Sequence, residues 1–140
     1  MRKKWSGLLL LVIGVLSVFL LSGCEGKPLP DGMDEETLLS SGQEIVDLLM
    51  AGEYQQVYDR FRSDVQESLT VDNVKNLMES ETKDAGEFEK VRDTLATGST
   101  EGEPHGIAVI YCKYSKDDVR FRVAFDPDMA LIGLEIGKID

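Results

Sequence analysis

The sequence is poor in the residue types from which most metal and catalytic sites are built. Its 140 residues include one histidine, His105, and two cysteines, Cys24 and Cys112. A single histidine with no cysteine close to it in the sequence argues against a zinc site. The chain also lacks the Gly-x-Ser-x-Gly turn that carries a serine nucleophile and the twelve-residue loop that binds calcium. We therefore expect no catalytic residue, no metal site and no cofactor, and we place His105 on the surface of a loop.

The sequence has no apolar run of the length that a membrane-spanning helix usually needs. The uncharged stretch from Leu8 to Leu21 holds 14 residues, whereas a helix needs about 20 to cross the bilayer core. Three basic residues at positions 2–4 precede this stretch, and small residues follow it. That order is typical of a secretory signal peptide, which we predict over residues 1–23.

The end of this segment, Leu21-Ser22-Gly23-Cys24, resembles the lipobox of bacterial lipoproteins. The resemblance implies that Cys24 receives a diacylglyceryl group on its sulfur and becomes the first residue of the mature protein. The alternatives are an ordinary signal peptide that contains a cysteine, or an uncleaved anchor. If Cys24 is lipidated, Cys112 has no partner for an intramolecular disulfide, and the domain depends on its hydrophobic core for stability.

Basic residues are few in the part of the chain that would be exported. Residues 24–140 contain 12 basic and 26 acidic residues, a net charge of −14. Such a surface repels nucleic acid phosphates and anionic lipid headgroups, so we expect no nucleic acid partner and assign membrane attachment to the lipid on Cys24. Two prolines and two glycines lie between Glu25 and Met33, which predicts a flexible tether over residues 24–33.

The next part of the chain has the periodicity of helices. We predict a first helix between the N-cap Asp34 and Gly52, a second from near Glu53, and a third between Thr70 and Gly86.

After Gly86 the hydrophobic pattern changes to the alternation of strands. Four strands are predicted, at Phe88–Leu95, Ile107–Tyr114, Asp118–Phe125 and Leu131–Ile136. The second is apolar on both faces, which indicates a central strand covered on both sides, and residues 97–106 are expected to form a flexible loop. Helices followed by an antiparallel meander predict one α+β domain over residues 34–140, with the N-terminal helices packed on a curved four-stranded antiparallel sheet.

Two parts of the sequence resemble domains related to nuclear transport factor 2. One is the run Gly-Glu-Tyr-Gln-Gln-Val-Tyr at residues 52–58, and the other is the pair of segments Val123–Asp126 and Leu131–Ile136. The chain is similar in particular to the DUF3887-type domain of bacterial exported proteins and lipoproteins, over residues 38–139. The resemblance implies a cystatin-like cone in which the helices and the concave sheet face surround a pocket. It also implies a domain that often dimerises through its sheet.

Four residues are candidates for ligand binding: Tyr58, Tyr111, Arg120 and Arg122. In a ketosteroid-isomerase-like relative, a pocket tyrosine and a carboxylate stabilise an oxyanion and move a proton. Tyr58 and its neighbour Asp59 point about 100° apart on a helix, so both cannot easily face one pocket. Arg120 and Arg122 share one face of a predicted strand. They either pair with acidic neighbours such as Glu135 or recognise an anionic ligand.

Two further features are expected to be structural. Cys112 lies in a predicted buried strand, where a free cysteine behaves as a small apolar side chain with an unreactive thiol. The pairs Asp117-Asp118 and Asp126-x-Asp128 could present oxygens to calcium, but adjacent carboxylates in tight turns are more often turn formers.

The sequence as a whole favours a lipid-anchored, non-enzymatic domain on the outer side of a bacterial cytoplasmic membrane. In a cell with two membranes the outer membrane is an alternative destination, because Glu25 after the cysteine is no clear signal for retention at the inner membrane. The domain would bind an unknown protein or small-molecule partner, or form a homodimer. The alternative is a small pocket enzyme with general acid–base chemistry. Such an enzyme should show polar residues converging in a dry pocket, whereas a binding module should show an apolar pocket or an exposed apolar sheet face.

Overall fold

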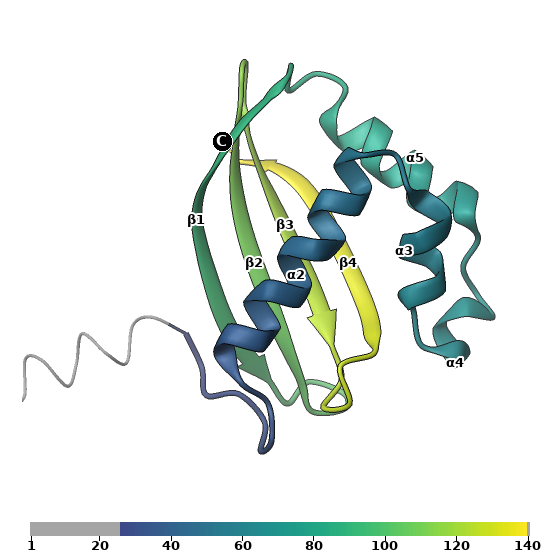
Figure 1. Ribbon diagram of the computed structural model, residues 1–140, viewed down its shortest axis with the longest axis vertical. Coiled ribbons are helices and arrows are strands. Elements are labelled where there is room, and N and C mark those ends of the chain that lie inside the picture. Colours follow the sequence, from purple (N-terminus) through teal and green to yellow (C-terminus); the bar gives the residue numbers. More distant parts are fainter. Residues whose placement is uncertain (1–25, 140) are drawn as a thin grey trace, which may run out of the picture.

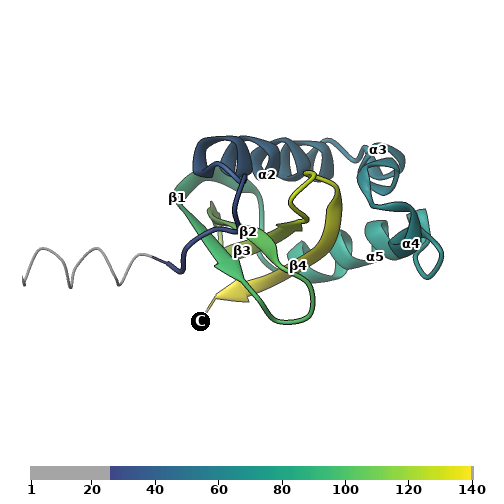
Figure 2. The same ribbon diagram turned by 90° about the horizontal axis from the view of Figure 1, so that it is seen from below.

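The computed structural model describes residues 26–139, which form four helices followed by four strands (Figure 1). The predicted signal peptide and Cys24 lie outside the described residues. The helix at residues 35–50 lies across one face of a curved antiparallel sheet, and the helix at residues 71–82 packs against the last strand (Figure 2). This arrangement confirms the predicted α+β architecture.

Two of the helices begin at the predicted caps. In α2 (Glu35–Met50), the Asp34 carboxylate accepts hydrogen bonds from the backbone N–H and the hydroxyl of Thr37, both at 2.9 Å. In α5 (Val71–Thr82), the Thr70 hydroxyl accepts from the Asn73 N–H while the Asn73 side chain accepts from the Thr70 N–H. These side chains satisfy backbone donors that have no partner within the helix.

Two short helices connect α2 to α5. The predicted second helix is α3 (Tyr54–Arg60), and α4 (Ser63–Gln66) was not predicted. The Arg62 N–H between them donates to the Leu131 carbonyl at 2.8 Å, so the connection is fixed to the last strand. A single turn of helix held by a distant strand has no periodicity by which the sequence could reveal it.

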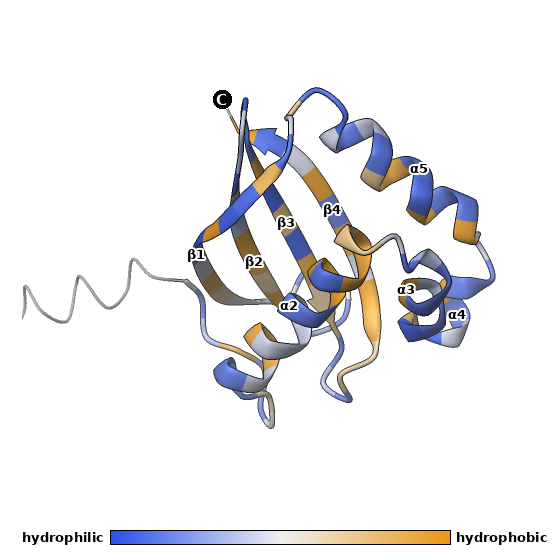
Figure 3. Ribbon diagram, turned by 45° about the horizontal axis from the view of Figure 1, so that its top comes forward, coloured by the Kyte–Doolittle hydropathy of each residue, from blue (hydrophilic) through white to orange (hydrophobic). Residues whose placement is uncertain are grey.

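The sheet has the strand order β1-β2-β3-β4. Its strands are β1 (Phe88–Ser99), β2 (His105–Tyr114), β3 (Asp118–Phe125) and β4 (Leu131–Ile139). Figure 3 shows the alternation of apolar and polar residues along β3 that predicted this strand. The strand β4 is three residues longer than expected.

The prediction of a flexible loop over residues 97–106 is wrong. Gly98 pairs with Gly106 and Ser99 with His105, so the hairpin loop shrinks to residues 100–104, and His105 begins β2. Gly98 resembled a loop residue in the sequence, but its role is close packing. A Cβ atom at this position would lie 1.9 Å from the Pro28 carbonyl oxygen, so only glycine lets the N-terminal segment approach.

The core lies between the helices and the sheet. Its β2 and β3 residues include Ile110, Cys112 and Phe121, all fully buried, and the helix α2 crosses β1, β2 and β3 above them. On the other side of β2, Ile107 and Val109 are 9% and 3% exposed. The prediction that this strand is buried on both faces is therefore confirmed.

The described part of the expected tether, residues 26–33, is packed against the domain. The Lys27 carbonyl accepts from the Gly98 N–H at 3.0 Å, and the Lys27 N–H donates to the Thr97 hydroxyl at 3.0 Å. Leu29 and Met33 pack against the core. The segment thus runs along the edge of β1, and the folded unit begins several residues before the predicted boundary at residue 34.

The thiol of Cys112 is expected to be inert in the folded protein. Burial raises the pKa of Cys112 to about 11, and the side chain is fully buried, so neither the thiolate nor the access that alkylation requires is present at pH 8. In a Cys24→Ala variant, iodoacetamide should modify Cys112 slowly in the native state and rapidly in denaturant. Equal rates in the two conditions would contradict the buried position.

Candidate functional site

Three of the four candidate residues meet on one surface of the sheet. We call the sheet surface that points away from the helices the distal face. Tyr111 of β2 is paired directly with Arg120 of β3, and Arg122 follows on the same face of β3. Arg122 Nε lies 3.3 Å from the Glu135 carboxylate of β4, as the pairing interpretation predicted. Arg120 is exposed and has no carboxylate within 4.0 Å among residues 26–139.

Tyr58 lies apart from this group. It belongs to α3 in the helical layer, where its hydroxyl donates to the Gln66 carbonyl at 3.4 Å. The Gln66 side-chain amide in turn donates to the Tyr58 carbonyl at 2.9 Å. Tyr58 therefore links α3 to α4, and a single site that includes Tyr58 and Tyr111 does not form.

The interior of the cone, where the family resemblance implies a pocket, is occupied by core side chains. Phe121, Phe125 and Leu131 are each at most 1% exposed there. Tyr114 of β2 also lies in this core and packs edge-on against Phe88, with ring centroids 5.8 Å apart. Burial raises the pKa of Tyr114 to about 12, so its hydroxyl stays protonated at neutral pH. These contacts stabilise the fold.

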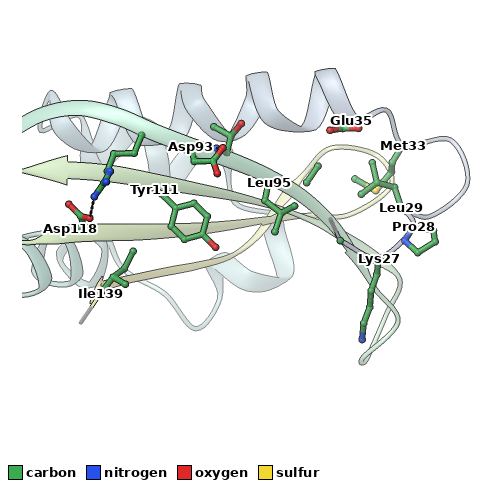
Figure 4. A pocket seen from close by; sticks show the side chains of 14 residues that line it. Lys27, Pro28, Leu29, Met33, Glu35, Asp93, Leu95, Tyr111, Asp118 and Ile139 are labelled. Carbon is green, nitrogen blue, oxygen red and sulfur yellow. Dashed lines mark hydrogen bonds and ion pairs between the residues drawn. The ribbon is translucent and has the colours of Figure 1, made fainter. Parts of the chain in front are cut away.

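Two hollows lie outside this core, over the distal face. The larger, a groove of about 1370 Å³, extends from the edge of β1 to Tyr111 of β2, Asp118 of β3 and Ile139 of β4 (Figure 4). Leu95 and Tyr111 lie between the N-terminal residues 27–29 at one end and Asp118 and Ile139 at the other. An ion pair between Arg92 and Asp118 closes part of this second end.

The smaller hollow, of about 470 Å³, spans all four strands over the distal face. Ala124 and Gly133 are cross-strand partners in its floor, and their small size leaves the space above them open. Arg122 and Glu135 line one part of it, and His105 lines another. The His105 Nδ1 donates to the Glu103 carbonyl at 2.8 Å, which occupies one of the two ring nitrogens.

The sequence interpretation missed a charged cluster around Arg62. The guanidinium forms two hydrogen bonds with Asp64, at 2.7 and 2.9 Å, and two with Glu103, at 2.6 and 2.9 Å. It donates a fifth to Asp126 at 3.1 Å. Hydrogen bonds from Arg62 lower the pKa values of Asp64 and Glu103 below their usual range. Asp64, Glu103 and Asp126 lie 2, 41 and 64 positions from Arg62 in the sequence. Only the pair of Arg62 and Asp64 is therefore close enough to be recognised from neighbouring residues.

Asp126 is the buried member of this cluster and organises the turn between β3 and β4. Its other carboxylate oxygen accepts from the N–H groups of Asp128 and Ala130, at 3.0 and 2.8 Å. The predicted role of Asp126 as a turn former is therefore confirmed. The Asp126 carboxylate bonds to Arg62 on one side and to the turn before β4 on the other. The cluster therefore holds β4 and the α3–α4 connection together.

Within residues 26–139, no group of three or more histidine, cysteine or acidic residues is arranged to hold a metal ion. None of the helices in this range has the length and apolar character needed to cross a bilayer.

Comparison with known families identifies the domain. The family model described as "Protein of unknown function (DUF3887)" matches residues 42–134, more than half of the chain. The chain belongs to the DUF3887 family. The match runs from the middle of α2 into β4 and includes Tyr111, Arg120 and Arg122 of the distal face and the Arg62 cluster.

A solved structure has the same fold as this DUF3887 protein. It is described as "NMR structure of protein from Ruminococcus gnavus ATCC 29149" and is 28% identical, with a TM-score of 0.64. The alignment covers 77% of this chain and 95% of the other. Comparison with curated proteins gives no match.

Proposed function

We propose that this protein is a lipoprotein of the bacterial cell envelope, anchored through a diacylglyceryl group on Cys24. We further propose that its DUF3887 domain is a non-enzymatic binding module of the nuclear transport factor 2-like superfamily. The anchor would place it on the outer side of the cytoplasmic membrane, or on the outer membrane of a cell that has two. The binding surface would be the distal face, where Tyr111, Arg120 and Arg122 lie together.

The observation that carries the anchoring proposal is the position of the lipobox-like sequence. Leu21-Ser22-Gly23-Cys24 ends three residues before Lys27, whose backbone is hydrogen-bonded to Thr97 and Gly98 of β1. Cleavage before Cys24 would therefore leave few residues between the lipid-bearing cysteine and the folded domain. That arrangement suits a protein attached through its first residue.

The described side chains favour binding over catalysis. An acid–base enzyme needs polar groups that converge on a substrate and are free to form hydrogen bonds with it. In the Arg62 cluster the polar groups are bonded to one another. On the distal face, by contrast, Arg120 is exposed beside Tyr111 and can reach a partner.

Replacing Cys24 by alanine should move the protein from the membrane fraction to the soluble extracytoplasmic fraction, or leave an uncleaved precursor. The physical reason is that removal of the sulfur removes the site for two acyl chains, each methylene of which contributes about 0.8 kcal/mol to membrane binding. The measurements are membrane fractionation and the mass of the mature N-terminal peptide. Cys112→Ala is the matched control, because it removes the other thiol and should leave both results unchanged. A mature chain whose Cys24 thiol is free would overturn the proposal.

A further inference from the structure

The N-terminal segment leaves very little free chain between the domain and the predicted lipid. Lys27 is hydrogen-bonded to Thr97 and Gly98 on β1. A Cβ atom on Gly26 would lie 2.8 Å from the Ala96 carbonyl oxygen, so this residue also lies against the strand. Two residues of extended chain span about 7 Å, which is the reach from Gly26 to Cys24. A domain on so short a link is held next to the bilayer.

The point of attachment borders the distal face. Lys27 lines both the groove along β1 and the hollow over the distal face, and the groove continues to Tyr111 and Leu95 (Figure 4). Gly26 and Lys27 therefore lie at the β1 margin of the sheet, on the side of the domain away from α3, α4 and α5 (Figure 1).

Charge separates the two layers of the domain. Residues 34–84, which contain the helices, have 13 acidic and 4 basic residues, a net charge of −9. Residues 88–139, which contain the sheet, have 9 acidic and 7 basic residues, a net charge of −2. Phosphate groups at a membrane surface repel the helical layer much more strongly than the sheet.

The distal face also has the residue types that suit the headgroup region. Leu95, Ile139 and Tyr111 are half-buried there, and the ring of a tyrosine combines an apolar body with a polar tip, as the membrane interface favours. Arg120 is exposed beside Tyr111 and can donate hydrogen bonds to a phosphate.

We propose that the distal face lies against the phospholipid headgroups of the membrane that carries the lipid anchor, with the helical layer directed away from it. This inference rests on the proposed function and names the partner of that same surface. The covalent lipid supplies the attachment, and the short link together with the charge difference sets the orientation. Tyr111 and Leu95 then approach the interface, and Arg120 meets the lipid phosphates.

The test compares two fluorescent labels on the lipidated protein. Arg120→Cys places a label on the distal face, and Lys75→Cys places one on the exposed side of α5. Each substitution removes one positive charge, so the two proteins keep the same net charge. The proteins are reconstituted in vesicles of phosphatidylethanolamine and phosphatidylglycerol that contain a lipid with a quencher on its headgroup. We expect the label at position 120 to be quenched severalfold more strongly than the label at position 75.

The outcomes separate the orientation from the anchoring. Equal quenching at both positions, or stronger quenching at position 75, would overturn the orientation while the protein remains membrane-bound. Contact between labels at position 120 of two copies, without lipid quenching, would assign the distal face to a homodimer and also overturn it. A chain without lipid would instead show the failure of the proposed function. Glu135→Cys on the distal face and Glu79→Cys on α5 repeat the comparison with Arg120 in place, and each of these substitutions removes one negative charge.

Discussion

Replacing Asp126 by alanine is expected to lower the free energy of unfolding by about 3 kcal/mol. The carboxylate is buried and accepts hydrogen bonds from two backbone N–H groups of its own turn and from Arg62. Its removal leaves those donors without their partner, and it frees the turn before β4 from the α3–α4 connection. An unsatisfied buried donor costs far more than an intact hydrogen bond contributes.

Urea denaturation in a Cys24→Ala background, followed by circular dichroism, measures this change. Asp128→Ala is the matched control, because Asp128 lies in the same turn and has the same charge, but its side chain is exposed. The control should change the stability by less than about 0.5 kcal/mol. Similar losses in the two variants would show that the turn needs negative charge in general and not the particular bonds of Asp126.

Replacing Gly42 by alanine is expected to destabilise the protein by about 2 kcal/mol, although alanine is the better helix former. A Cβ atom at this buried position of α2 would lie 2.5 Å from the Cβ of Ala108 on β2. Forcing the helix away from the sheet costs up to about 3 kcal/mol, and the gain in helix propensity offsets about 1 kcal/mol of that cost.

Two controls make the sign of the effect informative. Ser40→Ala changes an exposed residue of the same helix and should be neutral or slightly stabilising. The double variant Gly42→Ala/Ala108→Gly moves the methyl group from the strand to the helix and should recover most of the lost stability. If Gly42→Ala alone is stabilising, the contact between α2 and β2 is looser than the structure shows.

Local signals in the sequence account for the elements that were predicted well. Asp34 and Thr70 cap helices because their side chains bond to N–H groups within the next turn, so the whole interaction lies within four residues. The alternation in β3 is equally local, since each residue of a strand points to the opposite face from its neighbours.

The candidate site was predicted only in part. The placement of Arg120 and Arg122 on one face of a strand follows from the same alternation. Their association with Tyr111 depends on the register between β2 and β3, and the separation of Tyr58 depends on how α3 meets α4. The cluster around Arg62 joins segments up to 64 residues apart, and no pattern in any one of these segments reveals the others.

The sequence by itself determined the order and type of the main elements, the acidic character of the chain and the lipobox-like segment before the domain, because each depends on composition or on neighbouring residues. Tertiary structure alone decided that Gly98 admits the N-terminal segment to the edge of β1, that Arg62 gathers three carboxylates, and that the distal face remains free of helices within residues 26–139. The physical reason is that these features arise from contacts between distant segments, whose free energy is gained only after the chain has closed the intervening loops.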